Sequence, residues 1–379
     1  MRRWWWRQLA ANRAGVLIVV ALLLVTLLVP MPALPFRTLL VLAAVLAAGT
    51  LRFFLTDARV GRPPGKRFPI GRIRLHLLAE GEAGAHRPVI WVGGGHGEGL
   101  VMAHLHRAIA RETRSILFDR AGAGWSDPAP LPLTIASEVA HLDALLSAAG
   151  EQGPFVLAGH SFGGLFALNF AQRFPERVAA LVVMDPTPPA NVTVAGRVSF
   201  GALIAKAPWR ALALQFGMRW AGDPEIDDSA SAFGRAVSEW ADVINRNSLQ
   251  PKSVIAEAAA FEAAMHRSFD MVTGDGALAD IPLVLMLADP HAADEQHVHD
   301  QVKELLRLDV HQQRNFWRAM DESNEAQLRL SGNSHKVMAA PGSSHMFPYE
   351  CPEVVLDQVR RMLRVSAPAG EVATDSRAR

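Results

Sequence analysis

Apolar positions along this chain fall into two patterns, and each pattern predicts a different architecture. Near the N-terminus, residues 14–29 are uncharged, and a second apolar run extends from residue 38 to residue 55, interrupted by Arg52. From about residue 70 onward, short apolar runs alternate with longer segments of helical spacing. Apolar strands without polar alternation, each followed by a helix, are typical of a parallel sheet covered by helices on both faces.

The two N-terminal runs are separated by three prolines between residues 30 and 35. A membrane-spanning helix needs about 20 apolar residues, in a range of roughly 17–25, and each run reaches the lower part of this range with its flanks. Prolines interrupt a helix and suit a tight reversal of the chain. We therefore predict a transmembrane helical hairpin over 14–55, after a basic tail at 1–13 whose tryptophans would lie at the membrane interface.

Basic residues predict the orientation of this hairpin. Four arginines precede the first run, five Arg and Lys residues are found from Arg52 to Arg67 inclusive, and Arg37 alone lies between the runs. The positive-inside rule then places both ends of the hairpin, and the catalytic domain after it, in the cytoplasm at the cell (inner) membrane. Two alternatives stay open. A cleaved signal peptide is disfavoured by the Pro-Met-Pro after the first run, and a single span with an interfacial segment would place the domain outside.

Composition divides the rest of the chain into segments. Residues 56–68 are rich in proline, glycine and basic residues, which is typical of a linker. Strand and helix patterns fill 69–186 and resume at 281–365, so the core has two parts. Between them, 187–280 has helical segments, which we interpret as a lid over the carboxyl ends of the strands; a separate small subdomain is the alternative. The tail at 366–379 has no apolar pattern and is predicted to be disordered.

Charge and cysteine content narrow the classes of function. The 379 residues include 38 Lys and Arg and 37 Asp and Glu, and this balance argues against a nucleic-acid partner. Hydrophobic residues make up 50% of the chain, so it is not a disordered protein. The single cysteine, Cys351, excludes an intrachain disulfide and a multi-cysteine metal site. The oligomeric state stays open.

One short motif indicates the chemistry. The apolar strand at 154–159 runs into the pentapeptide GHSFG at 159–163, and a helical segment follows. This matches the nucleophile elbow G-x-S-x-G in the strand–turn–helix context that the motif requires. Gly159 and Gly163 leave space where strand and helix approach each other, and Ser161 is the predicted nucleophile. A glycine-rich turn with an idle serine is the alternative.

A serine nucleophile needs a general base, and the base needs an acid that orients it. We predict His345 as the base because it lies between the last predicted strand and the last helix. Two aspartates end predicted strands at the same sheet edge, Asp289 and Asp185. We take Asp289 as the acid and Asp185 as the alternative, with Asp294 as a third candidate. A proline follows both Asp289 and Asp185, so the alternative to a catalytic role is that either aspartate forms a turn.

The oxyanion that forms during attack needs two backbone N–H donors. Phe162, the residue after the nucleophile, is expected to supply one donor. We expect the other from Gly95, in the glycine-rich loop GGGHG at 93–97 after the strand at 88–92. Glycines allow the backbone to approach a substrate closely. A phosphate cradle is the alternative, but the loop lacks the Lys-Ser/Thr of a P-loop.

Together these motifs resemble the α/β-hydrolase fold superfamily over residues 69–365. The loop at 93–97 stands in the place of the HGGPG-like oxyanion motif, with Gly93 where many members have His. The segment DRAGAGWSD at 119–127 resembles D-R-x-G-x-G-x-S, which normally has a structural role beneath the active site. LVVMDP and the SGNSHKV…SSH pattern are similar to a branch of membrane-anchored bacterial members. In that branch an acid before the final helices is often unclear, which keeps Asp185 open.

The resemblance implies an α/β hydrolase that acts on uncharged acyl or related bonds and needs no cofactor or metal. We therefore expect a membrane-anchored serine hydrolase, esterase- or lipase-like, with a small apolar acyl substrate and an acyl-enzyme intermediate. Peptidase, thioesterase and acyltransferase chemistry on the same triad stay open. From a different class, a non-catalytic membrane-anchored binding protein could use the pocket under the lid.

Overall fold

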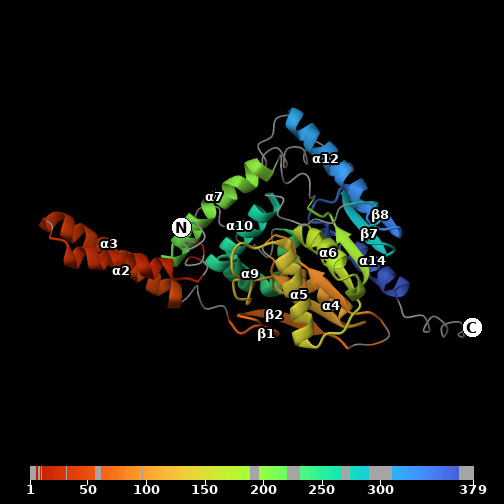
Figure 1. Cartoon of the computed structure of the whole chain (residues 1–379), viewed down its shortest axis with the longest axis horizontal. Coiled ribbons are helices and arrows are strands. Elements are labelled where there is room, and N and C mark those ends of the chain that lie inside the picture. The colour runs from red at the N-terminus through yellow and green to blue at the C-terminus, as the bar shows by residue number, and fades with distance from the viewer. Residues whose placement is uncertain are drawn as a thin grey trace, which may run out of the picture.

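The computed structural model describes residues 6, 9, 11–30, 32–55, 61–82, 84, 86–95, 97–187, 196–219, 231–265, 274–289 and 310–366. A body built around one sheet has helices on both sides of that sheet, and a pair of helices projects away from this body (Figure 1). Of the predicted segments, the tail beyond residue 366 and Asp294 lie outside the described residues.

The sheet has eight strands in the order β1-β2-β4-β3-β5-β6-β7-β8. The first two strands are antiparallel to each other, β2 is antiparallel to β4, and every pair from β4 to β8 is parallel. The predicted mostly parallel sheet is therefore confirmed. The strands are β1 (Lys66–Ile70), β2 (Ile73–Glu80), β3 (Val89–Val92), β4 (Ser115–Phe118), β5 (Phe155–His160), β6 (Val178–Met184), β7 (Leu283–Asp289) and β8 (Ser334–Pro341).

The first strand begins earlier than the sequence suggested. β1 starts at Lys66, inside the segment interpreted as a linker, and pairs with β2 from Lys66↔Leu77 to Ile70↔Ile73. The connection is a two-residue turn in which Gly71 has a φ of 61°. Glycine suits this turn because a side chain there would be strained.

The central strands are buried on both faces, which explains their unbroken apolar sequence. All six residues of β5 are buried. Alternate residues belong to two separate hydrophobic clusters, with Leu157 in one and Ala158 in the other. Helices α5 (Ile135–Ala149) and α6 (Phe162–Arg173) cover the first face, and α4 (Ala103–Ile109) and α14 (Pro352–Val365) cover the second. This three-layer arrangement fixes the strand ends that carry the site.

Local sequence explains where the helix beside the site begins and ends. Thr134 and Ser137 form a capping box at the start of α5, in which each side chain accepts a hydrogen bond from the other residue's N–H. At the other end, Gly150 closes the helix with a φ of 76°. These signals place Glu138 in the first turn of α5, close to the sheet edge.

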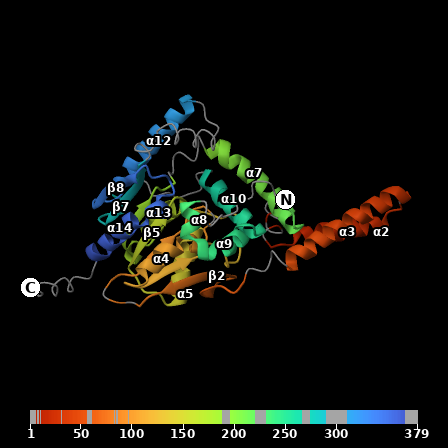
Figure 2. The same cartoon turned by 180° about the vertical axis from the view of Figure 1, so that it is seen from behind.

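Several helices lie between β6 and β7 along the chain, where the sequence predicted a lid. We call the described part of this insertion, α7 to α10, the cap. Its longest helices, α7 and α10, pack on each other, and both lie on the same side of the body in Figures 1 and 2. The cap helices are α7 (Gly196–Gln215), α8 (Ala232–Ala236), α9 (Ala241–Ser248) and α10 (Pro251–Met265). Two further described helices are α12 (Val310–Leu328) and α13 (Phe347–Glu350), and short 3-10 turns occur at Gly99–Met102, Pro175–Arg177 and Ser238–Trp240.

The N-terminal apolar runs form two helices, α2 (Ala14–Leu28) and α3 (Ala33–Leu55), which lie side by side as a hairpin (Figures 1 and 2). Within α3, the 21 residues Pro35–Leu55 contain an 18-residue window with a mean hydropathy of 2.1, and the segment is long and apolar enough to cross a membrane. Helix α2 has only 15 residues and ends before Pro30. It is therefore shorter than the roughly 17–25 residues of a typical span, and the prediction that both helices cross the membrane stays a prediction.

The base of the hairpin is fixed to the cap. The side-chain oxygen of Gln215, at the end of α7, accepts from Gly15 N–H at 2.7 Å, and its amide nitrogen donates to Leu9 O at 2.8 Å. A Cβ on Gly49 would lie 2.1 Å from Phe216 O, so glycine is required where α3 crosses this point. The hairpin thus meets the cap through main-chain contacts as well as side chains.

Candidate active site

Ser161 is the residue between the end of β5 and the start of α6. Its backbone has φ 56° and ψ −122°, a conformation that costs energy in any residue other than glycine. Hydrogen bonds hold the turn: Ser161 N–H donates to Met184 O at 2.9 Å, and Ser161 O accepts from Gly164 N–H at 2.9 Å and Thr187 N–H at 3.0 Å. Such a strained strand-to-helix turn presents the serine at the sheet edge.

The two elbow glycines lie where no side chain fits. A Cβ on Gly159 would be 2.3 Å from Gly163 O, and a Cβ on Gly163 would be 2.1 Å from Val92 O. On the other side of the elbow, a Cβ on Gly94 would be 3.0 Å from the Cβ of Ser161. The loop after β3 therefore lies directly against the serine.

His345 lies in the connection between β8 and α13, and its ring faces an aspartate. Its Nδ1 is 2.5 Å from Oδ2 of Asp185. Asp185 directly follows β6, has a φ of 41°, and donates its N–H to Met286 O at 2.8 Å. The Asp185 side chain is 18% exposed, so the bond forms in a partly desolvated place.

Asp289, the acid preferred from the sequence, has other contacts. It is the last residue of β7, and its N–H donates to Ser343 Oγ at 3.1 Å while its carbonyl accepts from Gly342 N–H at 3.0 Å. Between Asp289 and His345, both in the described part of the chain, there is no hydrogen bond. The structure thus pairs His345 with the alternative acid, because the loop after β8 passes β7 and reaches the ends of β5 and β6.

His160 is a neighbour of His345 that the sequence did not single out. The two rings have centroids 4.7 Å apart, and His160 Nε2 is 2.8 Å from His345 O. Burial, with the nearby charge of His345, lowers the pKa of His160 to about 4, so its ring is neutral at pH 7 and donates Nε2–H to this carbonyl. His160 therefore holds the main chain of the loop that carries the proposed base. The motif leaves this position open, so no sequence signal could identify it.

Opposing effects act on His345 itself. Burial lowers its pKa, but the hydrogen bond and the charge of Asp185, with the charge of Glu350, outweigh burial and leave the pKa above its ordinary value. The imidazole is 50% exposed, so solvent moderates each of these effects. Because Nδ1 faces Asp185, Nε2 is the ring atom that can take a proton from a nucleophile.

The expected oxyanion donors flank Ser161. Phe162 is the first residue of α6, where main-chain N–H groups point out of the helix end. Gly95 follows Gly94, has a φ of 37°, and lies in the loop that touches the elbow. His96, its neighbour, lies outside the described residues.

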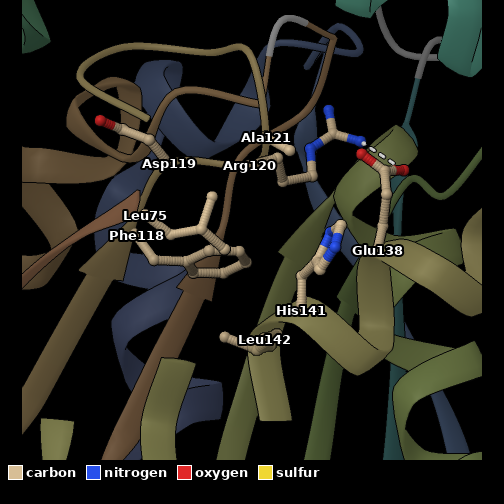
Figure 3. Close-up of a pocket in the computed structure, with 8 residues that line it drawn as sticks. All are labelled: Leu75, Phe118, Asp119, Arg120, Ala121, Glu138, His141 and Leu142. Atoms are coloured by element: carbon tan, nitrogen blue, oxygen red, sulfur yellow. Dashed lines mark ion pairs between the residues drawn. The ribbon is translucent and has the colours of Figure 1, made fainter. Parts of the chain in front are cut away.

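Arg120 lies beneath this loop and was not predicted as a site residue. Its side chain is 6% exposed, Nη2 donates to Gly95 O at 2.6 Å, and the guanidinium carbon is 4.7 Å from the Phe162 ring centroid. Figure 3 shows the guanidinium pointing toward the Glu138 carboxylate, with the His141 ring nearby; the closest Arg120–Glu138 atoms are 3.8 Å apart. The sequence marked the segment 119–127 as a structural motif, but it gave no indication that Arg120 itself contacts the active site.

The preceding aspartate has the structural role that the motif suggested. Asp119 accepts hydrogen bonds from Gly99 N–H at 2.8 Å and Trp125 N–H at 2.9 Å, and its Oδ2 is 2.8 Å from His76 Nδ1. In Figure 3 its carboxylate points away from Arg120. In the part of the chain that is described, no group of three or more His, Cys, Asp or Glu side chains is placed to hold a metal ion.

Comparisons with known proteins agree with this architecture. A family model described as alpha/beta hydrolase fold matches residues 87–206. Lipase LipV of Mycobacterium tuberculosis is 48% identical over 68 residues, which are 18% of this chain and 25% of LipV. The 2-hydroxy-6-oxo-2,4-heptadienoate hydrolase of Pseudomonas putida is 38% identical over 108 residues, 27% of this chain and 38% of that protein. The matches therefore span about a quarter to two fifths of these curated relatives.

Solved structures extend the likeness over most of the chain. A thermophilic esterase from Thermogutta terrifontis has a TM-score of 0.53 and 22% identity, and the match covers 80% of this chain and 100% of the esterase. The enol-lactonase from Burkholderia xenovorans has a TM-score of 0.53 and 16% identity, covering 79% of this chain and 100% of that structure. At these identities the likeness concerns the fold alone, and with the strand order it shows that the chain has the α/β-hydrolase fold.

Proposed function

On the premise of the α/β-hydrolase fold, we propose that this protein is a serine hydrolase, esterase- or lipase-like, that cleaves a carboxylic ester or a related acyl bond. One observation carries the proposal. Ser161 stands at a strained strand-to-helix turn, and the His345 loop at the same sheet edge is bonded to Asp185. Relatives named as a lipase and a hydrolase support the same class of reaction.

In the proposed reaction, Ser161 Oγ attacks the carbonyl carbon of the substrate. His345 Nε2 takes the hydroxyl proton and returns it to the leaving group, and Asp185 accepts the Nδ1–H bond and so fixes the tautomer. A water molecule then attacks the acyl-enzyme with the same base. Asp185 replaces Asp289 as the acid of the triad in this proposal.

The N–H groups of Phe162 and Gly95 are proposed to bind the oxyanion. Phe162 directly follows Ser161 in the sequence, and Gly95 follows Gly94, which lies against the side chain of Ser161. Backbone donors that are fixed before the reaction stabilise the developing charge without reorganising, and loss of one such donor costs about 10²–10³ in kcat. Mispositioning either segment should therefore reduce catalysis.

We infer that the hairpin anchors the enzyme in the membrane. Large apolar side chains are exposed along both helices, for example Leu28 at 74% and Val41 at 63%. A continuous apolar surface of this kind is unfavourable in water and suits a lipid environment. Helix α2 is about 22 Å long, against a hydrocarbon core of about 30 Å, so a full crossing would use its flanking residues.

The start of α2 and the later part of α3 both contact the cap, which supports a chain that enters and leaves the membrane on the same side. With the arginines gathered at these ends, the proposal places the domain in the cytoplasm, with two spans. A single span would place it outside. Ala33→Cys, at the start of α3, should react with a membrane-impermeant thiol reagent in whole cells, while Cys351 should react only after permeabilisation. Labelling of Cys351 in intact cells would overturn the cytoplasmic placement.

The substrate is proposed to be a small, largely apolar acyl compound that reaches the site from the membrane. Peptidase, thioesterase and acyltransferase reactions use the same triad and are distinguished by the leaving group and by the acceptor. Hydrolysis of a panel of p-nitrophenyl esters, thioesters and anilides across acyl lengths separates these reactions. Adding alcohol acceptors to the same assay reveals transfer.

A fluorophosphonate probe tests the proposed function directly, because it reacts with an activated serine. The detergent-solubilised full chain should be labelled, and Ser161→Ala should not be labelled although its circular dichroism is unchanged. Folded wild-type protein that resists labelling and hydrolyses none of the panel would instead support a membrane-anchored binding protein.

A further inference from the structure

Arg120 occupies a point where three separate parts of the fold meet. It is the second residue after the end of β4, its guanidinium bonds the carbonyl of Gly95, and the same group faces the ring of Phe162. Its own main-chain N–H donates to Gly97 O at 2.9 Å. One side chain therefore contacts both segments that are proposed to supply the oxyanion donors.

Two carboxylates from different layers act on this arginine. Glu138 comes from α5 in the body, and its side chain is 5% exposed. Glu257 comes from α10 in the cap, and its Oε1 would lie 3.8 Å from a Cβ placed on Gly95. Burial lowers the pKa of Arg120, and both carboxylates raise it. A guanidinium stays charged even so, since its unperturbed pKa is above about 12.

A buried charge of this kind is a weak source of stability. Removing a guanidinium from water costs several kcal/mol in effective terms, and apolar packing of similar volume often stabilises a protein as well or better. What a buried arginine provides, and apolar packing does not, is fixed geometry, because the planar guanidinium offers several hydrogen-bond donors in fixed directions. Gly95 needs such a restraint, since a glycine loop otherwise has wide conformational freedom.

We propose that Arg120 is a positioning residue that sets the geometry of the oxyanion hole, and that Glu257 makes this geometry depend on the cap. Holding Gly95 O fixes the backbone of the residue whose N–H binds the oxyanion. Contact with the Phe162 ring fixes the start of α6, and Phe261 of α10 packs on the same ring at 5.8 Å between centroids. The inference rests on the proposed hydrolase function and deepens it.

Loss of Arg120 should weaken transition-state binding and leave substrate binding nearly intact. Arg120→Gln is expected to lower kcat about 10²-fold, the effect of a donor misplaced by about 1 Å, with KM changed less than about 3-fold. Affinity for a trifluoromethyl ketone, which forms a tetrahedral oxyanion on Ser161, should fall by the same factor as kcat. Affinity for the matching methyl ketone, a ground-state analogue that adds poorly, should stay within about 3-fold.

Arg114 provides a matched control at the opposite end of the same strand. It precedes β4, donates to both carboxylate oxygens of Glu151 at 3.1 and 2.6 Å, and donates to Gly81 O at 3.1 Å. Arg114→Gln also removes an arginine–glutamate pair, but far from the elbow. It should lower the midpoint of thermal unfolding and leave kcat and trifluoromethyl ketone affinity within about 2-fold.

Two milder variants grade the effect and keep the test valid if Arg120→Gln does not fold. Arg120→Lys keeps the charge but loses the planar fork, so its kcat and trifluoromethyl ketone affinity should fall between those of the wild type and Arg120→Gln. Glu257→Gln should lower kcat and trifluoromethyl ketone affinity by a few fold, because it removes only the carboxylate that the cap places near Arg120 and leaves Glu138 in place.

The outcomes separate the inference from the function on which it rests. A folded Arg120→Gln or Arg120→Lys enzyme with wild-type kcat and wild-type trifluoromethyl ketone affinity overturns the positioning role. Equal losses for the ketone pair, with KM rising as kcat stays constant, also overturn it, since they would indicate a general binding defect. Absence of fluorophosphonate labelling in the wild type overturns the hydrolase proposal instead.

Discussion

The carboxyl ends of β6 and β7 are similar in sequence and different in structure. Asp185 directly follows β6, Asp289 is the last residue of β7, a proline follows each aspartate, and the strands are neighbours in the sheet. Asp185 turns away from its strand with a positive φ and bonds His345, whereas Asp289 remains paired with Pro341 of β8 after a shift in register. The comparison teaches that the way a chain leaves its strand decides which carboxylate meets the histidine.

Removing the proposed nucleophile or base should cause the largest loss of kcat, and the losses caused by changing the two aspartates are compared with it. Ser161→Ala and His345→Ala should each lower kcat by a factor on the order of 10⁶, because the members of a triad act as one unit. Initial rates with an activated ester measure the loss, and unchanged circular dichroism controls for folding. Residual activity near the wild-type rate in either variant would remove that residue from the mechanism.

Asp185→Asn should cause the next largest loss. An asparagine keeps the shape but favours the wrong imidazole tautomer, so kcat should fall by a factor on the order of 10⁴. Asp289→Asn is the matched control at the neighbouring strand end, and it should change kcat less than about 10-fold because Asp289 uses its main chain, not a bond to His345. The reverse ranking would return the role to Asp289.

The pH dependence of kcat/KM sharpens the same comparison. His345 works as a base only when neutral, and Asp185 raises its pKa, so wild-type activity should fall as the pH drops through a midpoint above about 6.5. Asp185→Asn removes that attraction, so the midpoint should move to lower pH, while Asp289→Asn should leave it in place. Equal midpoints in all three proteins would contradict the pairing.

Stability should respond to pH in a different window, which separates this activity loss from unfolding. Burial lowers the pKa values of His106 and His160 to about 4, whereas in the unfolded chain they are about 6.5. The unfolded state then binds more protons between these values, so the free energy of unfolding should decrease as the pH falls from about 6.5 to 4. Groups whose pKa is raised in the folded state have the opposite sign and stabilise the fold as the pH falls: His345 beside Asp185, and Glu98 and Glu138 through burial. Urea unfolding at several pH values measures the net effect, and a flat profile would contradict it.

The sequence was sufficient where a feature depends on neighbouring residues. The parallel sheet follows from unbroken apolar strands, and the position of Ser161 follows from a pentapeptide between a strand and a helix. Both arise within about twenty residues of chain, so the local pattern and the local structure coincide. The same holds for Gly159, because a Cβ there would meet Gly163 of the same turn, whereas a Cβ on Gly163 would meet Val92 of β3.

Features that depend on distant contacts could not be predicted in the same way. Asp185 and His345 are 160 positions apart, and only the path of the loop after β8 decides that they meet. In the sequence, Arg120 is only one position of a structural motif. Its contacts with Gly95 and Phe162 are visible only in the folded structure.

The contacts of Gln215 fix the start of the N-terminal hairpin to the cap. Gln215 is 1% exposed, and its side-chain amide bonds the main chain of Leu9, before α2, and of Gly15, in the first turn of α2. Cutting the chain after Leu55 to obtain a water-soluble fragment would strand this amide and uncover Leu214 and Phe216, and each unsatisfied buried polar group costs about 1–3 kcal/mol. Truncation is therefore expected to yield a fragment with a loosened cap, whereas full-length protein in detergent or nanodiscs keeps its native partners.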